Sequence, residues 1–283
     1  MSAAVTARRI GADALPEAIS LLSRAPRENL LLLDLAARLG QDAPPGEMAT
    51  ELVGAYRRGE LLGVATLRPT IACDAHMPPE AVDALLPIVE VLEVGLVKSD
   101  PASVGRLWAH LSRRRRHRVW IDRFETSYAL ARDAARLVEA DADCRVRGAG
   151  DGDLDSLVFA ARESLREEDR PDPFAGDARG FRRWVRGRVP RARLVERDGR
   201  VCFVGYADVQ RHDGWLLQGI YTWPDARRRG NAAIGTSALC REAFAAGADH
   251  VQLAVVDGND GAQRLYENLG FKPCGRLRTI LFT

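Results

Sequence analysis

The sequence has few residues of the kinds that bind metals or form disulfide bonds. Its five cysteines are an odd number, and no two of them stand at the spacing of a zinc ligand pair or a redox dithiol. The five histidines are equally dispersed and include no pair on one helix face. We therefore expect no metal site and reduced, mostly buried cysteines at Cys73, Cys144, Cys202, Cys240 and Cys274.

Long apolar runs and an excess of one charge are also missing. No stretch approaches the roughly 18 apolar residues of a membrane-spanning helix. Residues 1–8 lack the basic region and apolar core of a secretory signal. The 41 Lys+Arg residues nearly balance the 39 Asp+Glu residues, so the whole chain has no long-range attraction to nucleic acid or to anionic membranes. We expect a cytoplasmic protein with no membrane partner.

The length of 283 residues favours two domains, because single domains mostly contain about 100 to 200 residues. We predict an N-terminal domain over residues 1–126, a linker helix over the alanine-rich residues 127–143, and a C-terminal domain over residues 144–283. A glycine-turned hairpin occurs in both halves, with Gly199 following Gly59 by 140 positions. Such hairpins occur in unrelated folds, so they support a duplication only together with the order of the other elements.

That order predicts an α/β fold in each half. Each half has a strand, two helical segments, a hairpin, and then alternating helices and strands. The expected strands are 5–9, 51–56, 61–67, 94–97 and 118–123, then 145–147, the hairpin 194–203, 250–256 and 276–282. The expected helices are 15–23, 29–39, 79–91 and 102–111, then 154–165, 179–185, 233–246 and 259–269.

A strand, a loop with small residues and a helix follow each other in the C-terminal half. The strand starts at Gly214 and leads through Pro224 into Arg-Arg-Arg-Gly-Asn-Ala, residues 227–232, before a helix that ends at Gly247. Such a loop directs unpaired backbone N–H groups and the positive end of the helix dipole at one point, where a diphosphate fits. The alternative is a solvated basic turn without a ligand.

The next segment decides between these interpretations. The strand 250–256 ends in Asp257 and Gly258, and Asn259 is placed to cap a helix that carries Ala262 and Tyr266 on one side. A tyrosine on the face that carries a small alanine and a capping amide is placed to point into a cleft. Taken alone, it would be interpreted as core packing with its hydroxyl satisfied.

Together these two segments resemble the GNAT superfamily of N-acyltransferases. The resemblance rests on Thr222-x-Pro-x-x-Arg-x-x-Gly-x-Ala, which ends at Ala232, and on Asn259-x-x-Ala-x-x-x-Tyr-x-x-x-Gly-Phe, which ends at Phe271. It covers about 140 residues, including the terminal strand 276–282. The N-terminal half resembles the degenerate GNAT-like domain of a group of actinobacterial-type acetyltransferases. The implied fold is two tandem GNAT-like domains, each a mixed, mostly antiparallel sheet flanked by helices.

The resemblance also implies roles for single residues toward acetyl-CoA as acyl donor, with no metal. The strand before the loop is expected to splay from its neighbour, so that its backbone binds the pantetheine amides. Tyr266 would protonate the leaving CoA thiolate. Asn259 and Ala262 would line the pantetheine arm, and Ala233 would open the helix. The remaining donor-side positions are Ile220, Tyr221 and Thr222 for pantetheine, and Arg227, Arg228, Arg229, Gly230, Asn231 and Ala232 for the pyrophosphate.

One position departs from the family pattern. Many members have a glutamate that deprotonates the amine about four residues before Thr222, and this chain has Gln218, which is no base. Direct attack by a neutral amine, or a base from elsewhere, is then required. Acidic residues that could attract or deprotonate an amine occur where the family places its acceptor site, although a solvated helix end is the preferred explanation of each one. They are Glu163, Glu167, Glu168 and Asp169.

These features favour an N-acetyltransferase that moves an acetyl group from acetyl-CoA to a primary amine of a small molecule or peptide in a ternary complex. A non-catalytic acyl-CoA-binding or regulatory protein stays open because of Gln218. Transfer from aminoacyl-tRNA stays open because residues 113–118 contain five arginines, which could bind RNA phosphates or form a solvated helix end. No motif encodes the acceptor amine, the oligomeric state or the role of the N-terminal domain.

Overall fold

The computed structural model describes residues 3–114 and 117–283, so Arg115 and Arg116 of the arginine run lie outside the described residues. It divides the chain into two compact units. The N-terminal unit comprises Met1–Ala43, Glu47–Glu125 and Gly275–Thr283, and the C-terminal unit comprises Pro44–Gly46 and Thr126–Cys274. Both units have the same order of strands and helices. The repeated order predicted from the sequence is therefore confirmed.

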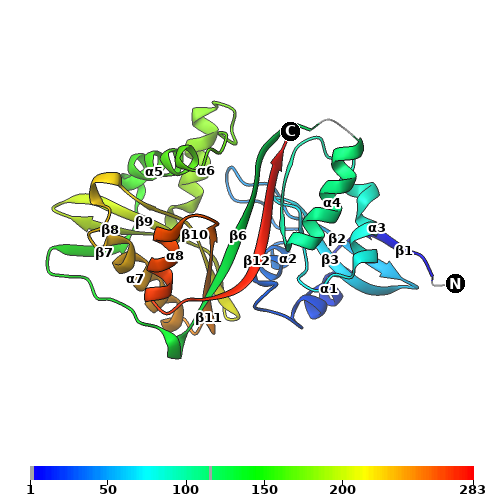
Figure 1. Cartoon of the computed structure of the whole chain (residues 1–283), viewed down its shortest axis with the longest axis horizontal. Coiled ribbons are helices and arrows are strands. Elements are labelled where there is room, and N and C mark those ends of the chain that lie inside the picture. The colour runs from blue at the N-terminus through cyan, green and yellow to red at the C-terminus, as the bar shows by residue number, and fades with distance from the viewer. Residues whose placement is uncertain (1–2, 115–116) are drawn as a thin grey trace. The chain divides into compact units, whose positions relative to one another are not determined.

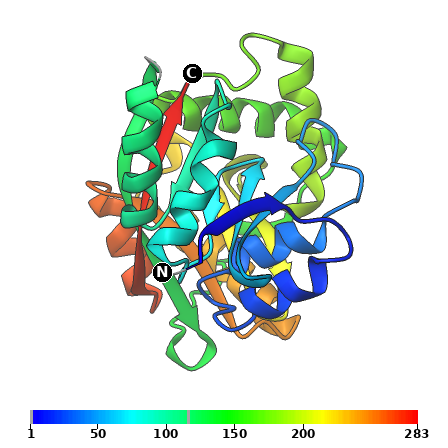
Figure 2. The same cartoon turned by 90° about the vertical axis from the view of Figure 1, so that its right-hand side faces the viewer.

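The N-terminal unit is built on a sheet with the strand order β1-β2-β3-β4. Helices α1 and α2 pack on one face of this sheet and α3 and α4 on the other, as Figure 2 shows. A parallel bridge between Ile71 and Val97 continues it to β5. The elements are β1 Val5–Arg9, α1 Leu15–Leu22, α2 Leu30–Ala37, β2 Glu51–Arg57, β3 Glu60–Arg68, β4 Ala72–Cys73, α3 Pro79–Val89, β5 Gly95–Ser99 and α4 Pro101–Arg114.

The C-terminal unit has the strand order β11-β10-β9-β8-β7, in which only β10 and β11 are parallel. Helices α5 and α6 cover one face and α7 and α8 the other (Figure 1). The elements are β7 Cys144–Gly148, α5 Leu154–Glu167, α6 Ala178–Arg188, β8 Ala192–Arg197, β9 Arg200–Arg211, β10 Gly214–Thr222, α7 Asn231–Ala245, β11 His250–Val256 and α8 Asp260–Asn268.

Two long strands contribute residues to both units. These are β6 (Val119–Ala131) and β12 (Lys272–Phe282), and the unit boundaries fall after Glu125 in the first and after Cys274 in the second. The end of β12 pairs antiparallel with β5, and its Ile280 and Phe282 are fully buried in the N-terminal unit. The terminal strand expected in the C-terminal domain therefore exists, but its residues from 275 onward belong to the N-terminal unit.

The predicted linker helix over residues 127–143 is wrong. Strand β6 continues to Ala131, a single 3₁₀ turn spans Arg132–Ala134, and the remainder is irregular. Tyr128 and Leu130 stand two residues apart, and both are buried in the core of the C-terminal unit. The burial of these two side chains at strand spacing outweighs the helix propensity of the alanines. The backbone beyond it bonds to neighbouring elements: Arg136 N donates to Leu269 O (2.9 Å) and Val138 N to Ser237 Oγ (3.1 Å).

The two hairpin turns have the same backbone conformation. Arg58 and Gly59 have φ values of 52° and 87°, and Asp198 and Gly199 have 53° and 71°. Two consecutive residues with positive φ are the signature of the two-residue turn that matches the twist of paired strands. The predicted tight turns are therefore confirmed in both units.

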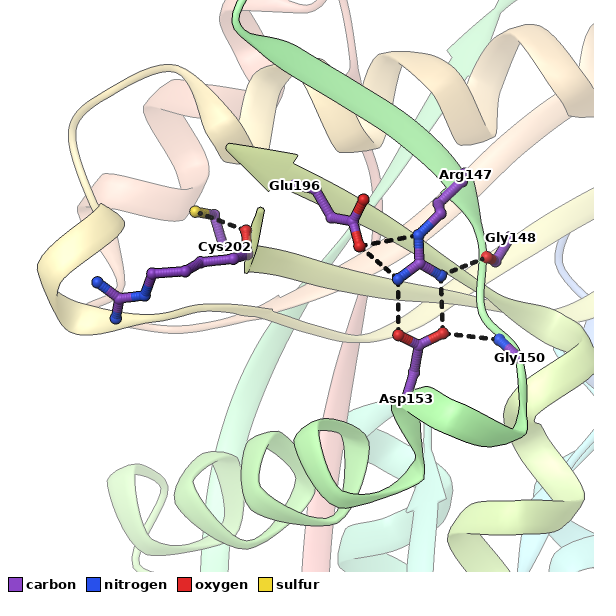
Figure 3. Close-up of polar contacts among 7 residues, drawn as sticks. Arg147, Gly148, Gly150, Asp153, Glu196 and Cys202 are labelled. Carbon is purple, nitrogen blue, oxygen red and sulfur yellow. Dashed lines mark hydrogen bonds and ion pairs between the residues drawn. The ribbon is translucent and has the colours of Figure 1, made fainter. Parts of the chain in front are cut away.

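An arginine between two carboxylates joins the edge strand β7 to the start of α5. Arg147 donates to both oxygens of Asp153 (2.6 and 2.7 Å) and from Nε to Glu196 on β8 (2.9 Å), as Figure 3 shows. Asp153 also accepts from Gly150 N (2.8 Å). The hydrogen bonds from Arg147 hold the pKa of both carboxyl groups below their usual values. The network therefore stabilises the turn between Gly148 and Asp153 that joins β7 to α5.

Replacing Arg147 by methionine should lower the free energy of unfolding by about 2–3 kcal/mol at pH 7, because two half-buried carboxylates lose their counter-ion. The pKa values of Asp153 and Glu196 are lower in the folded than in the unfolded chain, so this stabilisation is present above pH about 4 and is lost as the pH falls further. Urea unfolding of both proteins at pH 7 and below pH 4 tests this. An equal difference at both pH values, or an equal loss in the exposed Arg145→Met variant, would contradict it.

Candidate functional site

Strands β10 and β11 are paired over only part of their length. Within the described residues their parallel ladder consists of the pairs Trp215 with Val251 and Leu216 with Gln252. Both strands continue to their C-terminal ends at Thr222 and Val256 without further pairing to each other, while β10 stays paired with β9. The backbone edge of β10 after Leu216 is therefore available to a ligand that binds as an additional strand would.

A bulge on β10 lies directly beyond this point. Gln218 is opposite Tyr206 of β9, and the next pair is Tyr221 with Val204, so β10 holds one extra residue there. Gly219 has a φ of 58° within the bulge. Ile220 packs toward α7, whereas Tyr221 packs among residues of α5 and α6. The predicted pantetheine residues therefore lie on the separated part of β10, on both faces of the strand.

The loop after β10 presents a row of unpaired N–H groups. Among the described residues none of the six N–H groups at positions 228–233 donates a hydrogen bond, and α7 has no side chain that caps it. Arg228 and Gly230 have φ values of 60° and 79°, and Gly230 is the N-cap. The helix begins at Asn231, two residues earlier than Ala233, where the sequence analysis placed its opening. These N–H groups and the helix dipole suit a diphosphate.

Asn231 shapes the loop from inside. Its side chain is buried and donates from Nδ2 to Ala226 O (2.9 Å), and its Oδ1 accepts from Arg197 Nε (3.3 Å). Arg197 is held in turn by both oxygens of Asp141 (2.9 and 2.8 Å). The side chain of Asn231 is thus occupied within the protein, so that only its backbone N–H is left for a ligand.

The three arginines of the loop are exposed but differ in their contacts. Arg227 donates from Nη2 to both oxygens of Glu167 (2.6 and 2.8 Å) and from Nε to Thr222 O (3.0 Å). Neither Arg228 nor Arg229 has an ion pair within the part of the chain that the structure describes. Two arginines therefore remain for an anionic ligand, and the third ties the loop to the end of α5.

Helix α8 starts as the sequence predicts. Asn259 is its N-cap, and its Oδ1 accepts from Ala262 N (3.1 Å). Tyr266 is 6% exposed, and its ring meets Phe271 edge to face at 5.7 Å in the core cluster of the C-terminal unit. Burial raises the pKa of Tyr266 well above its usual value, and the neighbouring Cys240 adds to the rise. The phenol is therefore kept protonated. It is buried in the core, whereas the sequence predicted that it points into a cleft.

The acidic residues proposed for the acceptor side mostly have partners. Glu163 pairs with Arg166 (2.7 Å), Glu167 with Arg227, and Glu168 with Arg170 at 3.7 Å. Asp169 has a positive φ of 51° just beyond α5. Gln218 is exposed at the bulge, two residues after Leu216, where the pairing of β10 with β11 ends. Glu163, Glu167 and Glu168 are therefore engaged in ion pairs, and the bulge position Gln218 is not a carboxylate.

A charged cluster that the sequence analysis missed lies beside the bulge. Arg188, at the end of α6, is buried and donates from Nη2 to Asp208 Oδ2 (2.6 Å). Its guanidinium lies 4.0 Å from the Tyr206 ring centroid. A methyl group on Gly219 would lie 3.2 Å from Arg188 Nη2. Nothing in the sequence separates this arginine from its exposed neighbours on α6, because its burial depends on the packing of α6 against β9.

Two negative findings concern the described residues. No group of three or more His, Cys, Asp or Glu side chains there could hold a metal ion. None of the helices in that part of the chain is both long enough and apolar enough to cross a membrane.

Comparison with known proteins supports the fold. The model of the Acetyltransferase (GNAT) family matches residues 156–271. The structure is similar to that of a Drosophila protein, with a TM-score of 0.74, 13% identity and 98% of both chains covered. It is also similar to a GCN5-related N-acetyltransferase from Sphaerobacter thermophilus (TM-score 0.61, 16% identity, 98% and 95% covered). A tandem GNAT protein from the clavulanic acid biosynthesis pathway gives a TM-score of 0.55, 14% identity and 98% of both chains. The search of curated proteins gives no match. The expected tandem fold is therefore confirmed.

Proposed function

We propose that the GNAT-family acyltransferase domain formed by residues 156–271 transfers an acetyl group from acetyl-CoA to a primary amine by direct attack in a ternary complex. The observation that carries the proposal is the row of unpaired N–H groups at 228–233, directly after a strand that parts from its neighbour. A ligand with a diphosphate and an amide-containing arm would satisfy both features at once.

Each part of the donor has a counterpart on the chain. The diphosphate would accept from the N–H groups between Arg228 and Ala233, with Arg228 and Arg229 adding positive charge. The pantetheine amides would bond to the free edge of β10 at Ile220, Tyr221 and Thr222. Asn259 and Ala262 would line the opposite side, on the first turn of α8. The thioester would then reach the bulge at Gln218 and Gly219.

In the reaction the amine nitrogen bonds to the thioester carbonyl carbon, and the carbon–sulfur bond of the tetrahedral intermediate breaks. The amine nitrogen, which is positively charged after the attack, releases a proton to solvent water, and the CoA thiolate receives a proton from an acid. Tyr266 is the proposed donor to the sulfur. Because Gln218 accepts no proton, the amine has to arrive neutral.

The pH profile of turnover tests this mechanism. With primary amines in excess, the release of CoA thiol should rise about tenfold per pH unit below the pKa of the amine, because only the neutral amine reacts. A profile that levels off near pH 6 to 7 for every amine would reveal a base on the protein. If isothermal titration calorimetry detects no binding of acetyl-CoA at millimolar concentration, the assignment of acetyl-CoA as the donor is wrong. Tight binding without turnover of any amine would favour the acyl-CoA-binding alternative.

A further inference from the structure

The side from which an acceptor reaches the thioester follows from the packing of the C-terminal unit. Helix α7 covers one face of the sheet, where its Ile234 belongs to a core cluster with Phe203 and its Leu239 to a core cluster with Leu217. The acceptor therefore has to approach the bulge of β10 on the opposite face, which α5 and α6 partly cover. Arg188 lies on that face, next to Gly219.

We infer that the acceptor amine carries an anionic group, a carboxylate or a phosphate, and that Arg188 binds it. This inference rests on the proposed acetyl transfer. The guanidinium is buried, and the rings of Tyr206 and Trp184 lie 4.0 and 5.1 Å from its central carbon. A guanidinium that is fixed in this way forms directed pairs with carboxylates and phosphates at little cost in side-chain entropy.

The charge around Arg188 favours an anion. Asp208 pairs with Arg188 and also lies 3.5 Å from Arg191, so that this cluster holds two positive charges and one negative charge. Asp155 pairs with Arg182 of α6, and Asp177 is the N-cap of that helix. On the described part of α6 and the turn after it, six arginines stand against these three acids. They are Arg179, Arg182, Arg183, Arg186, Arg188 and Arg191.

Acidic side chains at the end of α5 do not cancel this excess. Glu163 and Glu167 are paired with Arg166 and Arg227 respectively. The surface beside the bulge thus attracts anions, and field effects of this kind raise association rates as well as affinity. An anionic amine would be enriched there over a neutral one.

Gln218 fits the same inference. A glutamate at this exposed position would place a negative charge on the bulge that carries Gly219, close to Arg188. That charge would repel an anionic acceptor and compete for the guanidinium. The neutral amide of Gln218 avoids both effects. An anionic acceptor would therefore explain both the absence of a glutamate at position 218 and the presence of the buried Arg188.

Arg188 could also act only as a structural clamp between α6 and β9, and substrate selectivity separates the two roles. The assay follows thiol release by the full chain with two pairs of amines, phosphoethanolamine with ethanolamine and β-alanine with β-alaninamide. We expect kcat/KM to be 10- to 100-fold higher for at least one anionic member than for its neutral twin. In Arg188→Gln this ratio should fall to within about threefold of one. Arg188→Lys should keep part of the ratio, and Arg264→Gln, exposed on α8, should keep all of it.

A binding measurement covers the case in which none of these amines reacts. Thermal shifts of the CoA-saturated protein with the same four amines should be larger for the anionic members, and Arg188→Gln should remove that difference. Equal responses to both members of each pair, including no response, overturn the inference if acetyl-CoA still binds. A clamp that merely weakens the fold would lower activity on all amines equally. Failure to bind acetyl-CoA at all would instead remove the proposed function, and the inference with it.

Discussion

Gly230→Asp should weaken acetyl-CoA binding by at least 100-fold, measured by isothermal titration calorimetry at low salt. The wild type should bind one acetyl-CoA per chain. Gly230 is the N-cap of α7 and has a φ of 79°. A carboxylate there would stand within about 4 Å of a bound diphosphate, where like charges repel by up to about 4 kcal/mol near a protein surface. The carboxylate would also accept hydrogen bonds from the N–H groups of the first helical turn, in competition with the diphosphate.

The matched control is Gly230→Asn. Asparagine has the same shape as aspartate and is likewise tolerated at positive φ. A Cβ at Gly230 meets no atom within 4 Å, so neither substitution clashes with the chain. The asparagine variant should bind within about tenfold of the wild type, and circular dichroism should show both variants folded. Equal affinities for the two variants would mean that no anion binds at this loop. A loss that high salt fails to reduce would point to distortion instead of charge.

We expect a single donor site per chain from a comparison of the two units. In the N-terminal unit, β4 and α3 correspond to β10 and α7 in the order of elements. There Pro78 is the N-cap of α3 and Pro79 its first residue, so two consecutive positions lack an N–H donor. Asp74 is buried nearby and accepts from Val64 N (2.8 Å) and His76 N (3.1 Å). A diphosphate would find a carboxylate where the other unit offers N–H groups. We therefore expect the N-terminal unit not to bind a diphosphate at this position.

The sequence predicts the parts of the site that depend on local chemistry. The cap at Asn259, the end of α7 before Gly247 and the two hairpin turns follow from side chains within a few residues of each other, and the structure has all of them. The parting of β10 from β11 was expected from the family resemblance alone. It depends on pairing between distant segments, which no local pattern contains.

Features that depend on tertiary packing were not predictable. Residues 127–131 have the composition of a helix, yet strand pairing and the burial of Tyr128 and Leu130 make them part of β6. The terminal strand β12 changes units at Gly275, and its sequence gives no sign of this. Arg188 is one of five arginines in α6, and only the fold shows that it is buried beside the bulge.

Tyr266→Phe should lower kcat by about 100- to 1000-fold and leave the affinity for acetyl-CoA within threefold of wild type. The magnitude is that of one proton donor or one hydrogen bond to a developing charge. Burial raises the pKa of Tyr266, so the phenol stays protonated throughout the range in which the enzyme can be assayed. Activity should therefore show no loss from ionisation of this tyrosine up to pH about 10.

Tyr128→Phe provides the matched control. Tyr128 belongs to the same core cluster, is equally buried, and donates from its hydroxyl to Glu267 Oε1 (3.2 Å) on the same helix that carries Tyr266. Removal of this hydroxyl should reduce stability slightly and leave kcat unchanged. A raised pKa makes Tyr266 a weak acid toward a thiolate, so we expect its main effect to be a hydrogen bond that stabilises the sulfur as the carbon–sulfur bond breaks. If both variants keep full activity, Tyr266 is a core residue and the thiolate takes its proton from water.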